Sequence, residues 1–184
     1  MTRSVFVTGH VRSGTSMTAG IFAAHGVFFG ACGGRVADSP KGRMENRWLK
    51  RTVEHGDRDG WPETWYDRLR AEGWDGEVPW GAKLMPKWWD WIRATQPTVI
   101  VCCYRPVDDI LASCERVGWP RSRKTVDQRW RRMGRIAGEH VVNVWTPSLI
   151  QGCYDAIEDA LSVLGLALDR EACAEWIEPE HFHA

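Results

Sequence analysis

The sequence predicts an α/β fold, a three-layer sandwich with a central, mainly parallel sheet. The run from Ser4 to Gly9 is short, rich in β-branched and aromatic residues and closed by glycine, as a buried strand is. The run from Thr98 to Tyr104 is apolar throughout rather than alternating, which is typical of a strand buried on both faces of a parallel sheet. Segments of helical periodicity separate the strand-like runs, and this alternation favours parallel strands joined by right-handed crossovers.

In the first half of the chain, one helix and one further strand are expected after the opening run. The helix spans Thr15 to His25, where apolar residues recur about every 3.6 positions until Gly26 ends it. The strand, a weaker candidate, spans Trp80 to Leu84. The segments Gly30 to Gly42 and His55 to Pro79 are rich in Gly, Pro, Asp and Trp, so we expect loops and short helices there, over the active face.

In the second half, two helices and one strand are expected. The segment from Pro106 to Arg116 begins with proline, which suits the first position of a helix. Val141 to Trp145 is a strand candidate. Tyr154 to Leu164 repeats apolar residues at helical spacing and stops at Gly165.

Length, charge and composition narrow the class of protein. The 184 residues are expected to form a single domain spanning 1–184. The 24 basic and 24 acidic residues leave no net charge, which removes the global attraction to nucleic acid or to an anionic membrane. No apolar run approaches the roughly 18 residues of a membrane span, and Met1 to His10 turns polar too early for a signal peptide, so a cytoplasmic protein is expected. The six cysteines form neither a C-x-x-C pair nor a Cys/His ladder and are expected to be reduced thiols, not metal ligands.

The strongest local signal is the segment Gly9-His10-Val11-Arg12-Ser13-Gly14-Thr15-Ser16, between the first strand and the first helix. A glycine-containing turn at the positive end of a helix presents backbone N–H groups, so the segment is predicted to cradle an anion. It nearly fits the pattern G-x-x-x-x-G-K-[ST], but Thr15 stands where nucleotide triphosphatases have lysine, and the strong cation, Arg12, lies inside the loop. An ordinary ATPase is therefore disfavoured. The alternative is a turn that merely joins strand to helix.

Three segments in the expected order resemble the sulfotransferases that use 3'-phosphoadenosine-5'-phosphosulfate. Val11 to Ser16 resembles their 5'-phosphosulfate loop. Tyr104 to Ser113 resembles their 3'-phosphate segment, in which an arginine at a strand end, here Arg105, is followed eight residues later by a serine. Trp80 to Pro86 resembles the lysine-containing strand end that bacterial members place before that segment. The resemblance implies a P-loop-like sulfotransferase fold and a reaction that requires no metal.

A donor with a 5'-phosphosulfate and a 3'-phosphate needs two anion sites on neighbouring strand ends, and this sequence offers two. Arg105 can grip a phosphate bidentately, and Ser113 can add a hydroxyl donor from the following helix. Taken alone, each residue has another interpretation. Arg105 could form a surface salt bridge with Asp108 or Asp109, and Ser113 could be a small residue that packs against another helix. The donor-binding residues that the resemblance implies are His10, Val11, Arg12, Ser13, Gly14, Thr15, Ser16, Arg105 and Ser113.

Sulfuryl transfer runs in line through a loose transition state, so the protein mainly positions groups and neutralises charge on the sulfonate and the bridging oxygen. Arg12 is the first candidate for that role, and Lys83 is the second. An equally good interpretation of Lys83 is a surface lysine at a strand end, whose ammonium extends into water.

The acceptor hydroxyl also needs a base. In the Lys-x-His members of the family a histidine stands two residues after the lysine, where this chain has Met85. Gly42 to Asn46 resembles a segment of bacterial members in which a glutamate faces the sulfonate, which makes Glu45 the candidate base, with a helix-start Glu paired to a nearby arginine as the alternative. A free glutamate has a pKa of about 4.3, so Glu45 would need desolvation or a late proton transfer. His10, inside the loop, is the second candidate.

Basic and aromatic residues cluster outside these motifs. The stretch from Arg121 to Arg135 has seven basic residues and one acid, which suits a flap over the 3'-phosphate or over an acidic acceptor, or else a solvated helix face. Trp119 and Trp130 suit either stacking on adenine or core packing.

Tryptophan is the outlier of the composition, with 12 in 184 residues. Aromatic walls suit a phenol or the face of a sugar, and we expect Trp61 and Trp65 to contact the acceptor. Trp88 and Trp91, three positions apart on a helix, are expected to face the core.

The sequence thus predicts an enzyme that moves a sulfonate from 3'-phosphoadenosine-5'-phosphosulfate to a hydroxyl or amine of a small molecule or carbohydrate, leaving adenosine 3',5'-bisphosphate. Two alternatives stay open. A nucleotide or small-molecule kinase of related fold is opposed by the missing lysine after Gly14. A non-catalytic binding module is favoured by the absence of the Arg-Lys-Gly 3'-phosphate loop of cytosolic relatives. The acceptor and the oligomeric state are not predicted.

Overall fold

Four parallel strands form the central sheet in the computed structural model, which describes residues 3–33 and 42–177. The strands are β1 (Ser4–Gly9), β2 (Trp80–Lys83), β3 (Val99–Tyr104) and β4 (Val141–Trp145), in the spatial order β2-β1-β3-β4. Val7 of β1 pairs with Lys83 on one side and with Val101 on the other. Since all the strands are parallel, the segments that follow β1, β2 and β3 leave the sheet at the same edge, where open α/β sheets bind ligands.

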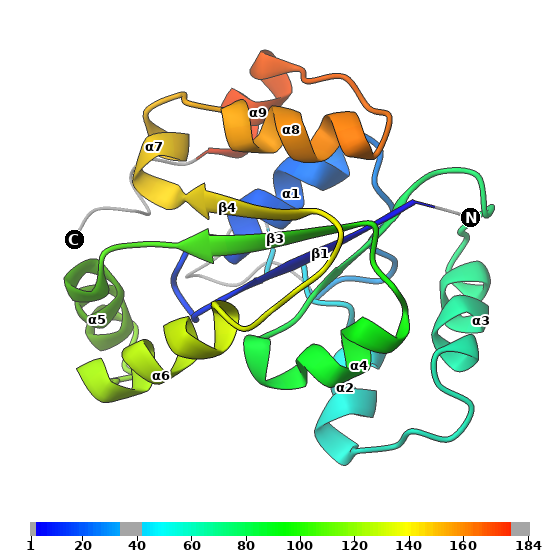
Figure 1. Ribbon diagram of the computed structural model, residues 1–184, viewed down its shortest axis with the longest axis horizontal. Coiled ribbons are helices and arrows are strands. Elements are labelled where there is room, and N and C mark those ends of the chain that lie inside the picture. The colour runs from blue at the N-terminus through cyan, green and yellow to red at the C-terminus, as the bar shows by residue number, and fades with distance from the viewer. Residues whose placement is uncertain (1–2, 34–41, 178–184) are drawn as a thin grey trace.

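Helices cover both faces of the sheet (Figure 1), which confirms the predicted three-layer α/β sandwich. One face carries α1, α8 and α9; the other carries α2, α3, α4 and α6. The helices are α1 (Thr15–Ala24), α2 (Arg47–His55), α3 (Glu63–Ala71), α4 (Trp89–Ala94), α5 (Val107–Arg116), α6 (Arg123–Met133), α7 (Thr146–Ile150), α8 (Asp155–Val163) and α9 (Arg170–Trp176), with a 3-10 turn, η1 (Pro86–Trp88), before α4.

Successive residues of the inner strands supply two separate cores. In β1, Val5 and Val7 pack under α1 and α8, whereas Phe6 packs on the opposite side. In β3, Val101 and Cys102 divide in the same way. Because both faces are covered, neither strand has a solvent face, and this is why both runs are apolar without alternation.

The predicted elements are present, with small shifts at their ends. The strand expected from Trp80 ends at Lys83, although the N–H of Leu84 still donates to the Val7 carbonyl at 3.2 Å. The helix expected to begin with Pro106 begins at Val107 instead. The segment His55 to Pro79 contains one helix, α3. Residues 34–41, most of the loop expected from Gly30 to Gly42, lie outside the described residues.

The expectation that Trp65 contacts the acceptor is wrong, because its side chain lies in the core, while for the half-buried Trp61 it stays a prediction. Trp65 is fully buried, stacks on Trp61 and meets Trp80, the first residue of β2, edge-on. The indole N–H of Trp61 donates to the carbonyl of Trp91 at 2.8 Å. α3 therefore lies toward the amino ends of the strands (Figure 1), away from the edge where β1 and β2 end. Trp91 is buried, as expected, so this aromatic cluster extends the core.

Within the described ranges, no helix combines the length and the apolar character that a membrane crossing requires.

The contact between α1 and α9 is tight enough to reverse the usual effect of a helix substitution. A methyl group on Gly20 would lie 2.2 Å from the ring of Trp176. Gly→Ala inside a helix ordinarily stabilises by about 1 kcal/mol, but overpacking costs about 1–3 kcal/mol. We expect Gly20→Ala to lower the free energy of unfolding in urea, and the same change in a Trp176→Ala background to raise it. Equal effects in both backgrounds would contradict this packing.

Candidate functional site

The Gly9–Ser16 loop joins β1 to α1 at the carboxyl edge of the sheet, and two of its glycines are required by close contacts. Gly14 precedes α1 with φ +85°, and a methyl group there would lie 2.7 Å from the hydroxyl of Thr146. A methyl group on Gly9 would lie 2.4 Å from the hydroxyl of Ser13. Arg12 also adopts a positive φ, of 67°. The glycine spacing therefore reflects the shape of this loop and not a chance turn.

Hydrogen bonds hold the loop in this shape. The N–H and the hydroxyl of Ser13 both donate to the His10 carbonyl, at 3.1 and 2.7 Å. The hydroxyl of Thr146, the first residue of α7, donates to the Ser13 carbonyl at 2.7 Å. Thr15 and Ser16 form the first turn of α1, where backbone N–H groups have no partner within the helix and attract anions. Unpaired N–H groups at the start of a helix are what the predicted anion cradle requires.

Lys83 brings a cation to the loop from the neighbouring strand. Its ammonium donates to the hydroxyl of Ser16 at 2.9 Å and to the carbonyl of Arg43 at 2.5 Å. It lies 3.4 Å from a carboxylate oxygen of Glu45. Only 7% of Lys83 is exposed, so the alternative of a surface lysine that reaches into water is wrong.

Glu45 lies between two lysines, just before α2. Its other carboxylate oxygen lies 3.2 Å from the ammonium of Lys50. Burial opposes the charge of Glu45, but Lys83 and Lys50 together outweigh burial and hold the pKa of this carboxyl below its ordinary value. Burial lowers the pKa of Lys83, and Glu45 counteracts part of that effect. Glu45 and Lys83 therefore form a partly buried ion pair beside the loop, in which each charge favours the other.

The second predicted anion site lies at the end of β3, and Arg12 reaches it. The guanidinium of Arg12 donates through Nε to the hydroxyl of Ser113 on α5 at 3.0 Å. Arg105, 3% exposed, donates to the Arg12 carbonyl at 3.4 Å. Its Nε also lies 3.7 Å from Asp109, so the salt bridge considered as an alternative is present, but longer than a good charge-assisted hydrogen bond. Arg12 thus links the two predicted sites.

His10 is fully buried at the base of the loop. Its Nδ1 lies 2.6 Å from the Val11 carbonyl, which can only accept, so Nδ1 carries the proton and Nε2 keeps a lone pair. Burial lowers the pKa of His10 to about 4, the Val11 hydrogen bond opposes this, and the charges of Arg129 and Arg121 add to it. The imidazole is therefore neutral at ordinary pH.

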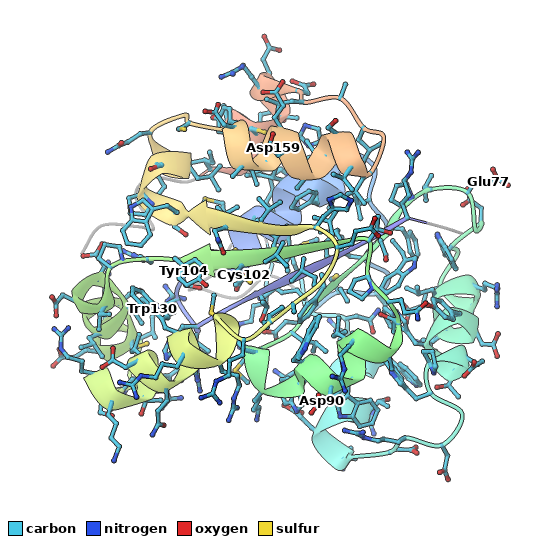
Figure 2. The ribbon with its side chains drawn as sticks, viewed as in Figure 1. Glu77, Asp90, Cys102, Tyr104, Trp130 and Asp159 are labelled. Carbon is cyan, nitrogen blue, oxygen red and sulfur yellow. The ribbon has the colours of Figure 1, made fainter. Side chains whose placement is uncertain are left out.

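The structure also shows where Trp119 and Trp130, the two residues considered for stacking on adenine, lie. Trp130 of α6 meets Tyr104 edge-on at 5.7 Å, below the end of β3 (Figure 2), and packs against the small cluster of Ile110, Cys114 and Val126, so it is a packing residue. Trp119, 39% exposed, lies under the guanidinium of Arg43 at 5.0 Å.

Neither Thr146 nor the Arg43 carbonyl was found from the sequence, because a single threonine and a backbone oxygen leave no recognisable pattern.

A parallel sheet with a glycine-containing loop that joins its first strand to a helix is the arrangement of a P-loop-like α/β fold. Two solved structures specify the fold further. The sulfotransferase domain of the olefin synthase of Synechococcus PCC 7002 superposes with a TM-score of 0.60 at 13% identity, over 98% of this chain and 79% of that one. Sulfotransferase STF1 from Mycobacterium tuberculosis H37Rv gives 0.53 at 15% identity, over 99% and 73%. The chain therefore has the sulfotransferase fold.

No protein-family model matches the chain, and no curated protein matches it by sequence.

The Glu45–Lys83 pair predicts a pH-dependent stability. Glu45→Gln leaves a buried ammonium without its carboxylate, which should lower the free energy of unfolding by about 1–3 kcal/mol at pH 7, since Lys83 keeps its two other oxygen partners. Because the folded-state pKa of Lys83 lies below its unfolded value of about 10.4, the unfolded state holds the proton more tightly, and stability rises with pH between these two values. The deficit of Glu45→Gln should therefore shrink toward pH 10 in urea titrations. Glu54→Gln, at an exposed position on α2, is the control, and a deficit independent of pH would contradict the coupling.

Proposed function

We propose that the protein is a sulfotransferase that takes its sulfonate from 3'-phosphoadenosine-5'-phosphosulfate. The observation that carries the proposal is the Arg12–Ser113 hydrogen bond, because it spans from the loop after β1 to the helix after β3. A ligand with an anion at each end of an adenosine ribose requires two cationic sites, one after each of two adjacent strands. The loop after β1 and the segment after β3 are two such places. The sulfotransferase fold of the chain supports the same reading.

In this proposal each side chain has one task. The first-turn N–H groups of Thr15 and Ser16 hold the 5'-phosphate, and Arg105 with Ser113 holds the 3'-phosphate. Arg12 and Lys83 supply positive charge to the sulfonate and to the departing oxygen in a loose, in-line transfer. Both are anchored by hydrogen bonds from neighbouring elements, so the charges are in position before the reaction begins.

The proposed base is Glu45. Its carboxylate lies beside Lys83 and is ionised at neutral pH because of the two lysines. A carboxylate of lowered pKa is a weak base, so it accepts the acceptor's proton late in the transfer, as the acceptor oxygen becomes acidic. The acceptor is a hydroxyl or amine of a small molecule or carbohydrate.

Ligand selectivity tests the proposal directly. A ligand that binds only the folded state stabilises it by about 2.7 kcal/mol at a concentration 100 times its Kd. We expect adenosine 3',5'-bisphosphate, without magnesium, to raise the melting temperature more than AMP at equal concentration does. Stabilisation by ATP with magnesium instead would favour a kinase, and no shift with any of the three would favour a binding module.

Arg105→Ala tests the 3'-phosphate site within that experiment. Loss of charge-assisted hydrogen bonds worth about 1.5–3 kcal/mol should weaken the bisphosphate about 10- to 100-fold. AMP, which lacks the 3'-phosphate, should bind the variant as it binds the parent protein. Arg116→Ala removes an exposed cation at the end of α5, the helix that follows Arg105, and is the control. An equal loss for AMP and for the bisphosphate would remove Arg105 from the site.

A further inference from the structure

Glu72, the C-cap residue of α3, carries a shielded carboxylate outside the proposed donor site. Its side chain is 6% exposed. One carboxylate oxygen accepts hydrogen bonds from the N–H of Ala31 at 2.6 Å and from the side-chain amide of Asn46 at 2.8 Å. The other oxygen accepts from Nε of Arg68 at 2.5 Å. Burying a carboxylate is costly unless hydrogen-bond donors replace its water, and here donors from three parts of the chain do so.

The backbone at Gly30 has the shape that lets this carboxylate approach. Gly30 adopts a φ of +68°, and a methyl group there would lie 2.2 Å from the Glu72 oxygen and 2.7 Å from the amide nitrogen of Asn46. A residue with a side chain would therefore displace both partners of the hydrogen bond. The glycine leaves room for the end of α3 to contact the segment before α2.

Asn46, the residue after the proposed base, carries this contact to α2. It is 3% exposed, and its side chain also donates to the Phe29 carbonyl at 3.3 Å and accepts from the N–H of Leu49 at 3.0 Å, which caps α2. Because Glu45 directly precedes the cap, the position of the cap determines where the Glu45 side chain begins. The cap also positions Lys50, one turn into α2, which pairs with the second carboxylate oxygen of Glu45.

The backbone around Glu45 is held by the same neighbouring segment. The Glu45 carbonyl accepts from the N–H of Gly33 at 2.8 Å, and the N–H of Arg47 donates to the Ala31 carbonyl at 3.2 Å. The preceding residue, Met44, has a positive φ of 53°. A residue with a side chain keeps that conformation only where the surrounding structure imposes it, and the pairing of residues 45–47 with 31–33 is one such constraint.

We propose that Glu72 is a positioning residue of the transfer site, which places Glu45 against Lys83. It does so by holding Ala31 and Asn46, one on each of the two paired segments. A carboxylate suits this task because it only accepts hydrogen bonds, and the two groups that meet its oxygen both donate. The inference rests on the proposed function, which makes Glu45 the base, whereas the contact of Glu45 with Lys83 is present in any case.

The pKa of Lys83 reports the position of Glu45 without any ligand. Burial lowers this pKa and Glu45 raises it, so the pKa falls when the carboxylate moves away. The thiols of Cys32 and Cys103 also lie near Lys83, but burial raises their pKa to about 11 and about 12, so both stay protonated at neutral pH. The Cε resonance of Lys83, observed by NMR in protein with isotope-labelled lysine, follows the protonation of the ammonium.

Three substitutions separate the hydrogen bonds of Glu72 from its charge. Glu72→Ala removes both, Glu72→Asp keeps the charge but is one methylene shorter, and Glu72→Gln loses the charge but keeps an oxygen that accepts the same two hydrogen bonds. We expect Glu45→Gln to lower the pKa of Lys83, and Glu72→Ala and Glu72→Asp to give at least about half of that fall. Glu72→Gln and the control Glu63→Ala, at an exposed position on α3, should leave the pKa near that of the parent protein.

Two results would overturn the inference. An unchanged Lys83 pKa in Glu72→Ala and Glu72→Asp would mean that Glu45 keeps its place without Glu72, and Glu72→Asp alone decides this if Glu72→Ala fails to fold. A fall in Glu72→Gln as large as that in Glu72→Asp would mean that hydrogen bonding by Glu72 does not explain the effect.

Failure of the proposed function is seen separately. The titration needs no donor, so it decides the role of Glu72 even if the parent protein does not bind adenosine 3',5'-bisphosphate. In that case the expected falls would still assign Glu72 to the placement of Glu45, and only the proposed function would be lost.

Discussion

The buried ammonium of Lys83 is the constraint on which the site depends. A buried lysine at the end of a strand, here β2 at the side of the sheet, is tolerated only where oxygen atoms replace its water. Two segments that are distant in sequence supply them: the first turn of α1 through the hydroxyl of Ser16, and the segment before α2 through the carbonyl of Arg43 and the carboxylate of Glu45. Satisfying one charge therefore fixes the first turn of α1 against the segment before α2. The loop, the strand end and Glu45 are held together by the same requirement.

The charges around the loop divide into two regions of different character. On the Lys83 side, the ammonium groups of Lys83 and Lys50 share the carboxylate of Glu45. Toward α5 and α6 the arginines outnumber the acids, with Arg12 on a serine hydroxyl and Arg105 at a long distance from Asp109. A compensated region suits the reacting centre, where charge must change without moving the protein, and a cationic region suits the capture of anions.

The sheet and the loop could be predicted because their causes are local. Strands buried on both faces must be apolar, Gly9 is required by its contact with Ser13 four residues on, and Gly14 by its positive φ, so both the strands and the loop leave a pattern in the sequence. The placement of Lys83 beside the loop follows from parallel pairing of β1 with β2. Long-range choices left no such pattern. The positive φ of Arg12 turns its side chain toward Ser113, Thr146 reaches Ser13 across 133 positions of sequence, and Trp65 packs in the core although its segment is polar.

The two candidate bases differ in what the fold allows them to do. His10 has a free lone pair on Nε2, but the residue is fully buried and its pKa is lowered to about 4, so proton transfer to it would bury a charge beside two arginines. Glu45 is partly exposed and sits against Lys83, so a proton that it accepts leaves the ammonium with its other two oxygen partners. A loose transition state develops little negative charge on the attacking oxygen before the bond to sulfur forms, and it demands only a weak base in the right place. In the proposed transfer, the position of the base therefore matters more than its basicity, and position favours Glu45.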